Sequence, residues 1–533
     1  MVVNAVTNPV ISGLNPDPSI CRVGSDYFVV TSSFEYFPGV PIYHSRDLVN
    51  WTLIGHALTR PSQLYMPRVE PGGGIFAPTL RYWKGTFYLA TCCVYRRNSR
   101  ICSESRGFYV RTDDIFDSST WSEPIWFDAL GIDQDLFFDD DDKVYLCTSR
   151  LLDVHSSDPH NGAVVMGCEV DLQTGQCLTR PVVLRQSLEA NLCTEAPHIL
   201  KRGDFYYLLV AEGGTEINHQ ARIYRSRSPL GPYDDAPEGV NPIMFNGTHP
   251  VVQNSGHADF VEDLNGNHWA FFLAVRVQAN GHRPLGRETF MAPVEWTADG
   301  WPVINKGRPI TLDVLDASKL PEVRPYRGWR DTFAGKTLGI NWYHLRVPVK
   351  PHHSLQPGRL TLHGNAFTIA DTDCPAMLLV KQTELSGTWS TQLDFEPTTV
   401  DQEAGVTVYW SCYAYAALVV RKSHEPDGHR EVVLRWIDEH SEDVKTVEIK
   451  QSLSAIGPVG LSIHATPTSY TFAFQPVGSD EETILGSVST AVLERSRSFD
   501  ASYTGTHLGI FAQGTQGVPC QDGAHFAYAG FSV

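Results

Sequence analysis

Long apolar runs, basic clusters and regularly spaced cysteines are all missing from this sequence. No run of 18 apolar residues occurs, so a membrane-spanning helix is excluded. The 42 Lys and Arg residues are outnumbered by 60 Asp and Glu residues and form no long cluster. Because nucleic acids and anionic membranes are bound through basic surfaces, we expect neither as a partner.

The cysteines and the first residues bear on the cellular compartment. The 11 cysteines are scattered, without the spacing of a zinc site or a disulfide framework, so reduced and mostly buried thiols are expected. Residues 1–19 lack the basic segment and apolar stretch of a secretory signal. The sequence therefore predicts a cytoplasmic protein, or a secreted one whose signal peptide has been removed.

A strand-like phrase recurs five times in the first 275 residues. The copies start at Asp17, Ala77, Asp133, Ala196 and His257, which lie 60, 56, 63 and 61 residues apart. Each copy combines an apolar strand, a tight turn and a second strand rich in Tyr, Phe and Val, a pattern typical of a β-hairpin. Each interval leaves room for two more strands, and a four-stranded sheet repeated radially is a propeller blade. We therefore predict an all-β fold with a five-bladed β-propeller over residues 1–310.

The rest of the chain has a different sequence pattern. Residues 311–328 form a connector that contains proline and charged residues. Residues 329–533 contain alternating runs such as GTWSTQLDFEP and REVVLRWID, which indicate a β-sandwich, here predicted as a concanavalin-like jelly roll.

Acidic residues at two places in the repeat receive different interpretations. Residues 139–142, all Asp, align with the hairpin turn of the other copies, where aspartates serve local hydrogen bonding. Asp17 and Asp133 instead begin their copies, and Glu195 directly precedes the fourth. Equivalent positions of successive blades surround one axis, so these three carboxylates are expected to converge.

Converging carboxylates separate into an acid and a base, because like charges and burial raise the pKa of at least one of them. An ionised carboxylate can activate water while a protonated one donates to a leaving oxygen, which is the chemistry of glycoside hydrolysis. Each acid taken alone could also be a turn residue. His257, at the start of the fifth copy, could be a core histidine, a pKa tuner or a metal ligand.

Several motifs resemble glycoside hydrolase family 43, most closely its two-domain β-xylosidases. They are NPDPS, GGGIFAPTL, GIDQDLFFDDDDKVYL, TEAPH, EGGT and GRETF, in the order of the family. The resemblance implies an inverting mechanism with Asp17 as general base and Glu195 as general acid. Asp133 would raise the pKa of Glu195 and orient it. Inversion requires the carboxyl groups of Asp17 and Glu195 to lie about 6.5 to 9.5 Å apart.

The resemblance also implies substrate-binding residues. Arg287, Phe34 and Thr215 would form the terminal subsite, and Phe76 stands where the family commonly has Trp. His257 matches an axial histidine that holds Ca²⁺ in some relatives, so no cofactor is required but Ca²⁺ on the axis is left open. Asp135 stands where Ser is usual, and its carboxylate is expected to point away from the substrate.

The resemblance predicts an exo-acting enzyme that releases xylose from the non-reducing ends of β-1,4-xylo-oligosaccharides. An α-L-arabinofuranosidase, or an enzyme with both activities on arabinosylated xylan fragments, is the nearest alternative. A non-catalytic carbohydrate-binding propeller is an alternative from another class. The second domain is expected to pack on the propeller and help close the active site, and a homo-oligomer is left open.

Overall fold

A computed structural model describes residues 6–95, 105–152, 162–187, 193–326, 328–426, 428–438, 446–494 and 503–533. The chain divides into two compact units. The first comprises residues 1–65, 73–277 and 287–324, and the second comprises residues 66–72, 278–286 and 325–533. Residues 1–5 of the predicted propeller and Arg327 of the predicted connector lie outside the described part.

Antiparallel sheets make up the first unit, and within its described residues there are five of them. The first sheet contains β1 (Ser19–Val23), β2 (Asp26–Val30), β4 (Gly39–Ser45) and β5 (Thr52–Leu58). The second contains β6 (Gly74–Ile75), β7 (Thr79–Trp83), β8 (Thr86–Val94), β9 (Ser105–Thr112) and β10 (Ile125–Leu130). The third contains β11 (Ile132–Phe138), β12 (Val144–Leu151), β13 (Ala163–Glu169) and β14 (Val182–Arg185). The fourth contains β15 (Thr194–Arg202), β16 (Phe205–Glu212), β17 (Gln220–Ser226) and β18 (Met244–Phe245). The fifth contains β19 (Val252–Glu262), β20 (His268–Arg276), β21 (Arg287–Trp296) and β22 (Pro302–Ile304).

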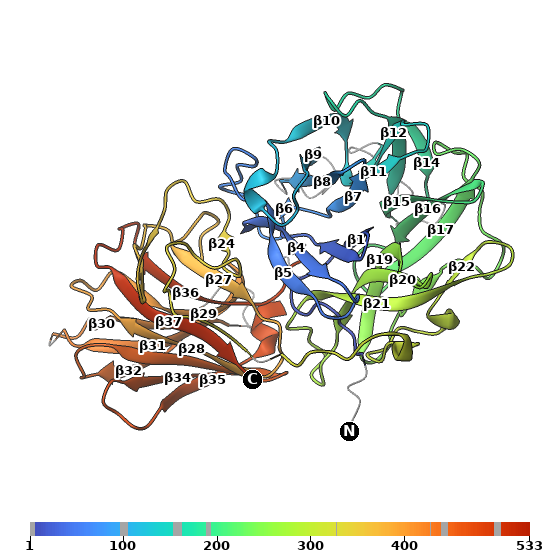
Figure 1. Ribbon diagram of the computed structural model, residues 1–533. Coiled ribbons are helices and arrows are strands. Elements are labelled where there is room, and N and C mark those ends of the chain that lie inside the picture. The colour runs from blue at the N-terminus through green and yellow to red at the C-terminus, as the bar shows by residue number, and fades with distance from the viewer. Residues whose placement is uncertain are drawn as a thin grey trace. The chain divides into compact units, whose positions relative to one another are not determined.

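The sheets of this unit follow one another around a centre, with β1, β7, β11, β15 and β19 nearest to it (Figure 1). Each of these strands contacts the corresponding strand of the next sheet, and β19 contacts β1, so the ring closes. This is a propeller-type arrangement. It brings residues near the starts of these strands together although they are far apart in the chain.

Apolar cores lie between neighbouring sheets of this unit. Tyr88 and Tyr109 of the second sheet pack with Leu136 and Leu146 of the third. The third and fourth, fourth and fifth, and fifth and first sheets share similar clusters. Burial of each such side chain contributes about 1.5–3 kcal/mol, so the packing of the sheets supports the ring of strands.

Hairpin turns follow the first strand of each repeat. Gly24 and Gly203 have positive φ values of 60° and 59° in two of these turns, which glycine adopts without steric cost. Residues 139–142 lie in the equivalent turn between β11 and β12, where the amide of Asp142 donates to the carbonyl of Asp139 at 3.1 Å. The prediction that these four aspartates are turn residues is confirmed.

Two sheets form most of the second unit. One contains β23 (Trp329–Asp331), β25 (His353–Gln356), β26 (Arg359–Leu362), β28 (Gly387–Asp394), β33 (Val459–Ala465), β34 (Ser469–Pro476), β35 (Thr483–Ser489) and β37 (Ala524–Ser532). The other contains β27 (Met377–Lys381), β29 (Gln402–Ser411), β30 (Ala414–Lys422), β31 (Arg430–Ile437), β32 (Thr446–Leu453) and β36 (His507–Gly514). Two-residue strands β3 (Tyr36–Phe37) and β24 (His344–Leu345) complete the strands of the described residues.

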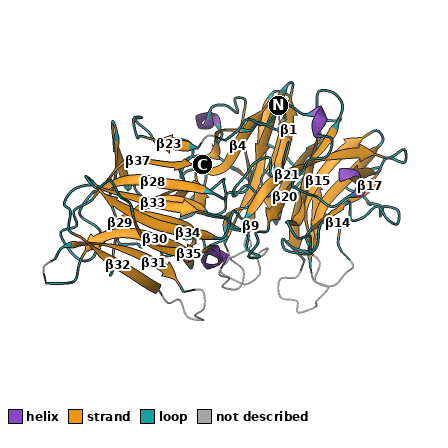
Figure 2. Ribbon diagram, turned by 90° about the horizontal axis from the view of Figure 1, so that it is seen from below, coloured by secondary structure: helices purple, strands orange, loops and turns teal. Residues whose placement is uncertain are grey.

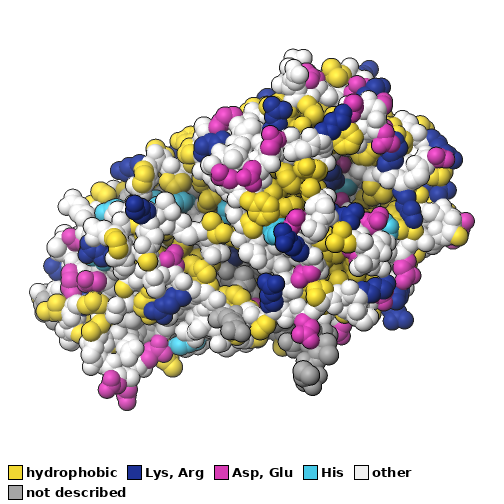
Figure 3. Space-filling view, viewed as in Figure 1, with side chains coloured by type: hydrophobic (Ala, Val, Ile, Leu, Met, Phe, Trp, Pro, Cys, Tyr) yellow, Lys and Arg dark blue, Asp and Glu magenta, His cyan; other side chains and the backbone are white. Residues whose placement is uncertain are grey.

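Helical structure in the described residues is limited to four short 3₁₀ turns, and strands dominate the molecule (Figure 2). The turns are η2 (Ser118–Thr120), η3 (Asn305–Gly307), η4 (Ala317–Lys319) and η5 (Thr490–Glu494). None of the helices in the described part is long and apolar enough to cross a membrane. Basic and acidic side chains are interspersed on the face shown in Figure 3, without a broad basic area.

The division into units differs from the predicted boundaries of 1–310, 311–328 and 329–533. Residues 311–324 group with the first unit, where Val314 is buried and its amide bonds to the carbonyl of Val6. Residues 66–72 group with the second unit, where Arg346 donates to the carbonyl of Val69 at 2.6 Å. Both differences arise from contacts distant in sequence.

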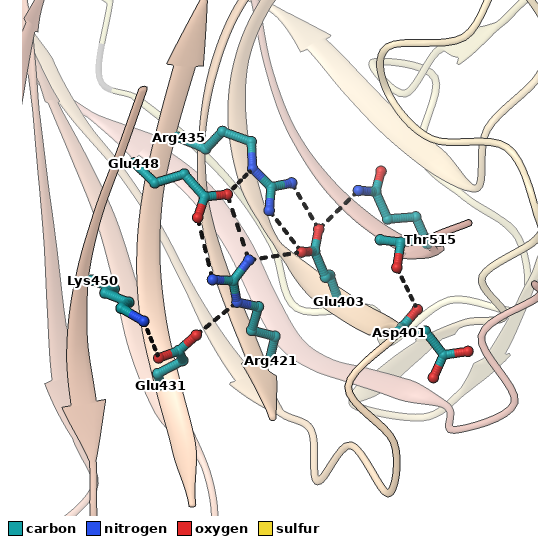
Figure 4. Close-up of polar contacts among 9 residues, drawn as sticks. Asp401, Glu403, Arg421, Glu431, Arg435, Glu448, Lys450 and Thr515 are labelled. Atoms are coloured by element: carbon teal, nitrogen blue, oxygen red, sulfur yellow. Dashed lines mark hydrogen bonds and ion pairs between the residues drawn. The ribbon is translucent and has the colours of Figure 1, made fainter. Parts of the chain in front are cut away.

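A largely buried ion-pair network crosses four strands of the second unit, β29 to β32 (Figure 4). Arg435 binds Glu403 through two hydrogen bonds of 2.8 and 2.9 Å. Arg421 binds Glu431 at 2.8 Å and Glu448 at 3.2 Å, and Glu448 also accepts from Arg435 at 2.7 Å. Glu403–Arg421, Arg421–Glu431 and Arg435–Glu448 are direct cross-strand pairs, so one face of the sheet gathers these charges.

Removing one charge from this network should destabilise the protein strongly. The side chain of Glu403 is only 3% exposed, so Glu403→Gln removes a buried counter-charge from both arginines and leaves Arg435 only the partly exposed Glu448. We expect a loss of about 3–5 kcal/mol, which corresponds to a fall of roughly 10 °C in thermal midpoint. Lys450→Gln is the matched control, because Lys450 is 57% exposed and 4.0 Å from Glu431. Equal midpoints for the two variants would show that the network contributes little.

Candidate active site

An unusual backbone conformation recurs at the start of four repeats. Asp17, Asp133, Ala196 and His257 all have left-handed φ values, between 53° and 55°. The strand register shifts at three of these places, between Ile132 and Asp135, between Glu195 and His198, and between Gly256 and Asp259. Such strain in residues other than glycine costs roughly 1–3 kcal/mol each and is typical of functional sites. The repeat therefore builds one irregular strand entry several times around the ring.

Asp17 is buried and held by cationic and hydroxyl donors. Nη1 of Arg287 donates to its Oδ1 at 3.1 Å, and Oγ of Ser32 donates to its Oδ2 at 2.5 Å. Nδ1 of His257 lies 3.5 Å from Oδ1. Burial alone would raise the pKa of Asp17, but the positive charge of Arg287 and the bond from Ser32 outweigh it and hold the pKa below its usual value. Asp17 is therefore ionised at neutral pH, as a base must be.

Asp133 and Glu195 form the acidic side of the site. Oδ2 of Asp133 accepts the amide of Ala196 at 2.9 Å, which ties Asp133 to the residue that follows Glu195. Burial and the negative charges of Glu195 and Asp17 raise the pKa of Asp133 well above its usual value. Burial and the charge of Asp17 raise the pKa of Glu195 to about 7. Because Asp133 and Glu195 titrate as an interacting pair, the pair retains a proton at neutral pH.

The predicted binding residues gather around Arg287. Its Nη1 also donates to Oγ1 of Thr215 at 2.9 Å, and its guanidinium lies 5.4 Å from the ring centre of Phe34. The rings of Phe34 and Phe76 are 5.3 Å apart. Gly74 allows its strand to pack closely against the backbone of Phe34, because a Cβ there would lie 2.2 Å from the carbonyl oxygen of Phe34. The structure thus brings all four residues into one group that includes Asp17.

Histidines complete the surroundings of Asp17. His219, which sequence analysis did not single out, bonds through Nδ1 to the carbonyl of Asn254 at 2.9 Å. Burial lowers the pKa of His219 to about 4 and that of His257 to about 3, so both are neutral at neutral pH. The described residues contain no group of three His, Cys, Asp or Glu side chains arranged to hold a metal. No catalytic step is therefore assigned to Ca²⁺, and the metal role of His257 stays a prediction.

These pKa shifts predict a bell-shaped dependence of kcat/KM on pH. Activity should fall as pH rises through about 7, because Glu195 then loses its proton. It should fall on the acid side only below the usual pKa of an aspartate, where Asp17 becomes protonated. Hydrolysis of an aryl glycoside over the acid to alkaline range measures both limbs, and Glu195→Gln should remove the alkaline limb. A wild-type profile that stays flat through neutral pH would contradict the assignment of Glu195.

A propeller-type domain whose strand entries gather one ionised carboxylate and a proton-holding carboxyl pair has the groups that glycoside hydrolysis requires. The sequence matches the glycosyl hydrolases family 43 over residues 6–302 and the β-xylosidase C-terminal concanavalin A-like domain over residues 330–532. The chain belongs to glycoside hydrolase family 43.

Relatives within the family carry different activities in their names. A non-reducing end α-L-arabinofuranosidase of Bacteroides ovatus is 36% identical, over 95% of this chain and 91% of the relative. A β-xylosidase of Bacillus subtilis is 35% identical, over 79% of this chain and 80% of the relative. The crystal structure of a xylan β-1,4-xylosidase from Bacillus halodurans is similar with a TM-score of 0.88 and 30% identity, covering 99% of this chain and all of that one. The concanavalin-like prediction for the second domain is confirmed by the match over residues 330–532.

Proposed function

We propose that this glycoside hydrolase is exo-acting and releases xylose from the non-reducing ends of β-1,4-xylo-oligosaccharides with inversion. The observation that carries the proposal is the separation of pKa values between Asp17, held low by Arg287, and Glu195, raised to about 7. A binding protein without catalysis needs groups that recognise hydroxyls but no such acid and base. The β-xylosidases among the relatives support the choice of sugar.

The proposed reaction is a single displacement at the anomeric carbon. Asp17 takes a proton from water as the water oxygen forms a bond to that carbon. Glu195 donates its proton to the glycosidic oxygen as the bond between carbon and oxygen breaks. Asp133 holds the amide of Ala196 and so orients Glu195. Arg287 and Thr215 would bind hydroxyls of the terminal sugar, with Phe34 and Phe76 as its apolar wall.

An α-L-arabinofuranosidase, or an enzyme with both activities, is the second candidate. It is favoured by the identity of 36% to a relative that bears this name. Comparison of kcat/KM on the nitrophenyl β-xyloside and the nitrophenyl α-L-arabinofuranoside tests the choice. We expect the xyloside to be preferred by at least about tenfold, a difference of about 1.4 kcal/mol in transition-state binding. Preference for the arabinofuranoside would overturn the proposed sugar while leaving the acid/base roles.

We also propose that the five sheets of the first unit are five blades around one axis. The closed ring of contacts among β1, β7, β11, β15 and β19 supports this. The packing role of the second domain and its part in closing the active site remain proposals that follow from the family.

A further inference from the structure

One arginine at the centre of the ring contacts the first strands of the four other sheets. Nη1 of Arg81, on β7, donates to Oγ of Ser19 at 3.2 Å and lies 3.1 Å from Oδ2 of Asp259. Its Nη2 lies 2.7 Å from Oδ1 of Asp135 and 3.1 Å from Nδ1 of His198. These partners belong to β1, β19, β11 and β15. A single guanidinium therefore links the strands that form the ring.

Further hydrogen bonds run from these side chains to the backbone of neighbouring sheets. The amide of Ile20 donates to Oδ2 of Asp259 at 3.2 Å. The amide of Leu80 donates to Oγ of Ser19 at 3.1 Å, and the amide of Ile199 donates to Oδ2 of Asp135 at 2.9 Å. Ser19 also donates to Asp259 at 2.8 Å. A shift of Arg81 or of either carboxylate would thus displace the backbone of adjacent strands.

The contacts of Arg81 lie very close in sequence to the reacting carboxylates. Ser19 is two residues from Asp17, Asp135 is two from Asp133, and His198 is three from Glu195. Asp17 and Asp133, which have left-handed φ values, are themselves residues of the site. Ala196, which also has a left-handed φ value, lies between Glu195 and His198. A movement of the residues that contact Arg81 would therefore be transmitted through only a few bonds to Asp17, Asp133 or Glu195.

The charges at this centre are buried and paired with one another. Asp135 is fully buried, and Asp259 and Arg81 have side chains only 7% and 19% exposed. Burial by itself would raise the pKa of Asp259, but Arg81 outweighs it and keeps the pKa below its usual value. Replacing such buried pairs by apolar residues is often neutral for stability, and their best-attested role is to fix register. This favours a geometric role for the cluster over a purely stabilising one.

We propose that Arg81 is a positioning residue that sets the relative placement of Asp17, Asp133 and Glu195 by holding the five strand starts together. The inference rests on the proposed glycosidase function. Asp135, expected from sequence only to point away from the substrate, is one of the residues through which Arg81 would hold the strands. A displacement of about 1 Å at reacting groups can lower the rate about 10²-fold, so loss of Arg81 should lower kcat measurably.

The test compares Arg81→Met with the wild type and with Arg227→Met, an arginine whose side chain is 66% exposed. With folding verified by circular dichroism and thermal midpoint, we expect kcat on xylobiose to fall about 10²-fold in Arg81→Met. KM should change little. The alkaline limb should also shift, because a changed separation from Asp17 changes the pKa of Glu195. The loss should be smaller on a dinitrophenyl xyloside, which needs less help from the acid. Arg227→Met should match the wild type.

Asp135→Asn provides a second test, because it removes one charge while keeping an acceptor for the amide of Ile199. We expect about a tenfold loss in kcat, smaller than in Arg81→Met because the displacement is partial, together with a shift of the alkaline limb. This variant decides the question if Arg81→Met does not fold. Unchanged kcat and pH profile in the folded variants would overturn the inference alone. A wild type that hydrolyses neither the xyloside nor the arabinofuranoside would overturn the proposed function and this inference with it.

Discussion

Asp17→Asn should lower kcat on xylobiose by about 10³-fold, the middle of the range for loss of a general base. The amide keeps the shape of the side chain, and its oxygen can still accept from Ser32 or Arg287. It cannot take a proton from water. Because the proposed partner of Asp17 is water and not the sugar ring, we expect KM and the calorimetric affinity for xylobiose to change only a few-fold.

Asp141→Asn is the matched control for this substitution. Asp141 is 56% exposed, lies in the hairpin turn after β11 and is 3.9 Å from Lys143. The Asp141→Asn variant should hydrolyse xylobiose at the wild-type rate. Hydrolysis by Asp17→Asn at a comparable rate would remove Asp17 from the mechanism, whereas loss of both binding and folding would make its role structural.

Glu195→Gln should show an effect that depends on the leaving group. For xylobiose, whose leaving oxygen needs a proton, kcat should fall by about 10²- to 10⁴-fold. For a dinitrophenyl xyloside, whose leaving group departs as an anion, the loss should be far smaller. The ratio of the two rates in wild type and variant, measured at one pH, isolates proton donation from other effects of the substitution.

Asp133→Asn is an informative companion to that variant. Asp133 holds the amide of Ala196 and shares the proton of the acidic pair, so its loss should also be larger for the poor leaving group. A Glu195→Gln variant that slows both substrates equally would contradict the role of Glu195 as acid.

The repeat carried the information from which the sequence predicted that Asp17, Asp133 and Glu195 lie together. Aligning the copies placed Asp17 and Asp133 at equivalent positions and put Glu195 beside the fourth, and these positions share one irregular conformation. The alternation of residues along a strand and the turn residues are local signals, so they can be seen in the sequence. The turn aspartates were separated from Asp133 for the same reason.

Other parts of the site depend on contacts between distant segments and escaped prediction. Ser32, His219 and Arg81 gain their roles only because separate strands meet at one centre. In four of the five repeats, the second residue after the start belongs to the Arg81 cluster, and this shared position would have indicated part of it. The four residues are Ser19, Asp135, His198 and Asp259. The grouping of residues 66–72 and 278–286 with the second unit has no local signal, because it reflects tertiary packing.

The proposed role of Asp17, the activation of water for a single displacement, determines the configuration of the product. Proton NMR during hydrolysis of xylobiose observes the anomeric configuration of the first xylose released from the non-reducing end. We expect α-xylose, which then mutarotates to the equilibrium mixture. Initial release of β-xylose would show retention of configuration and would contradict the role of Asp17 as the base that activates water.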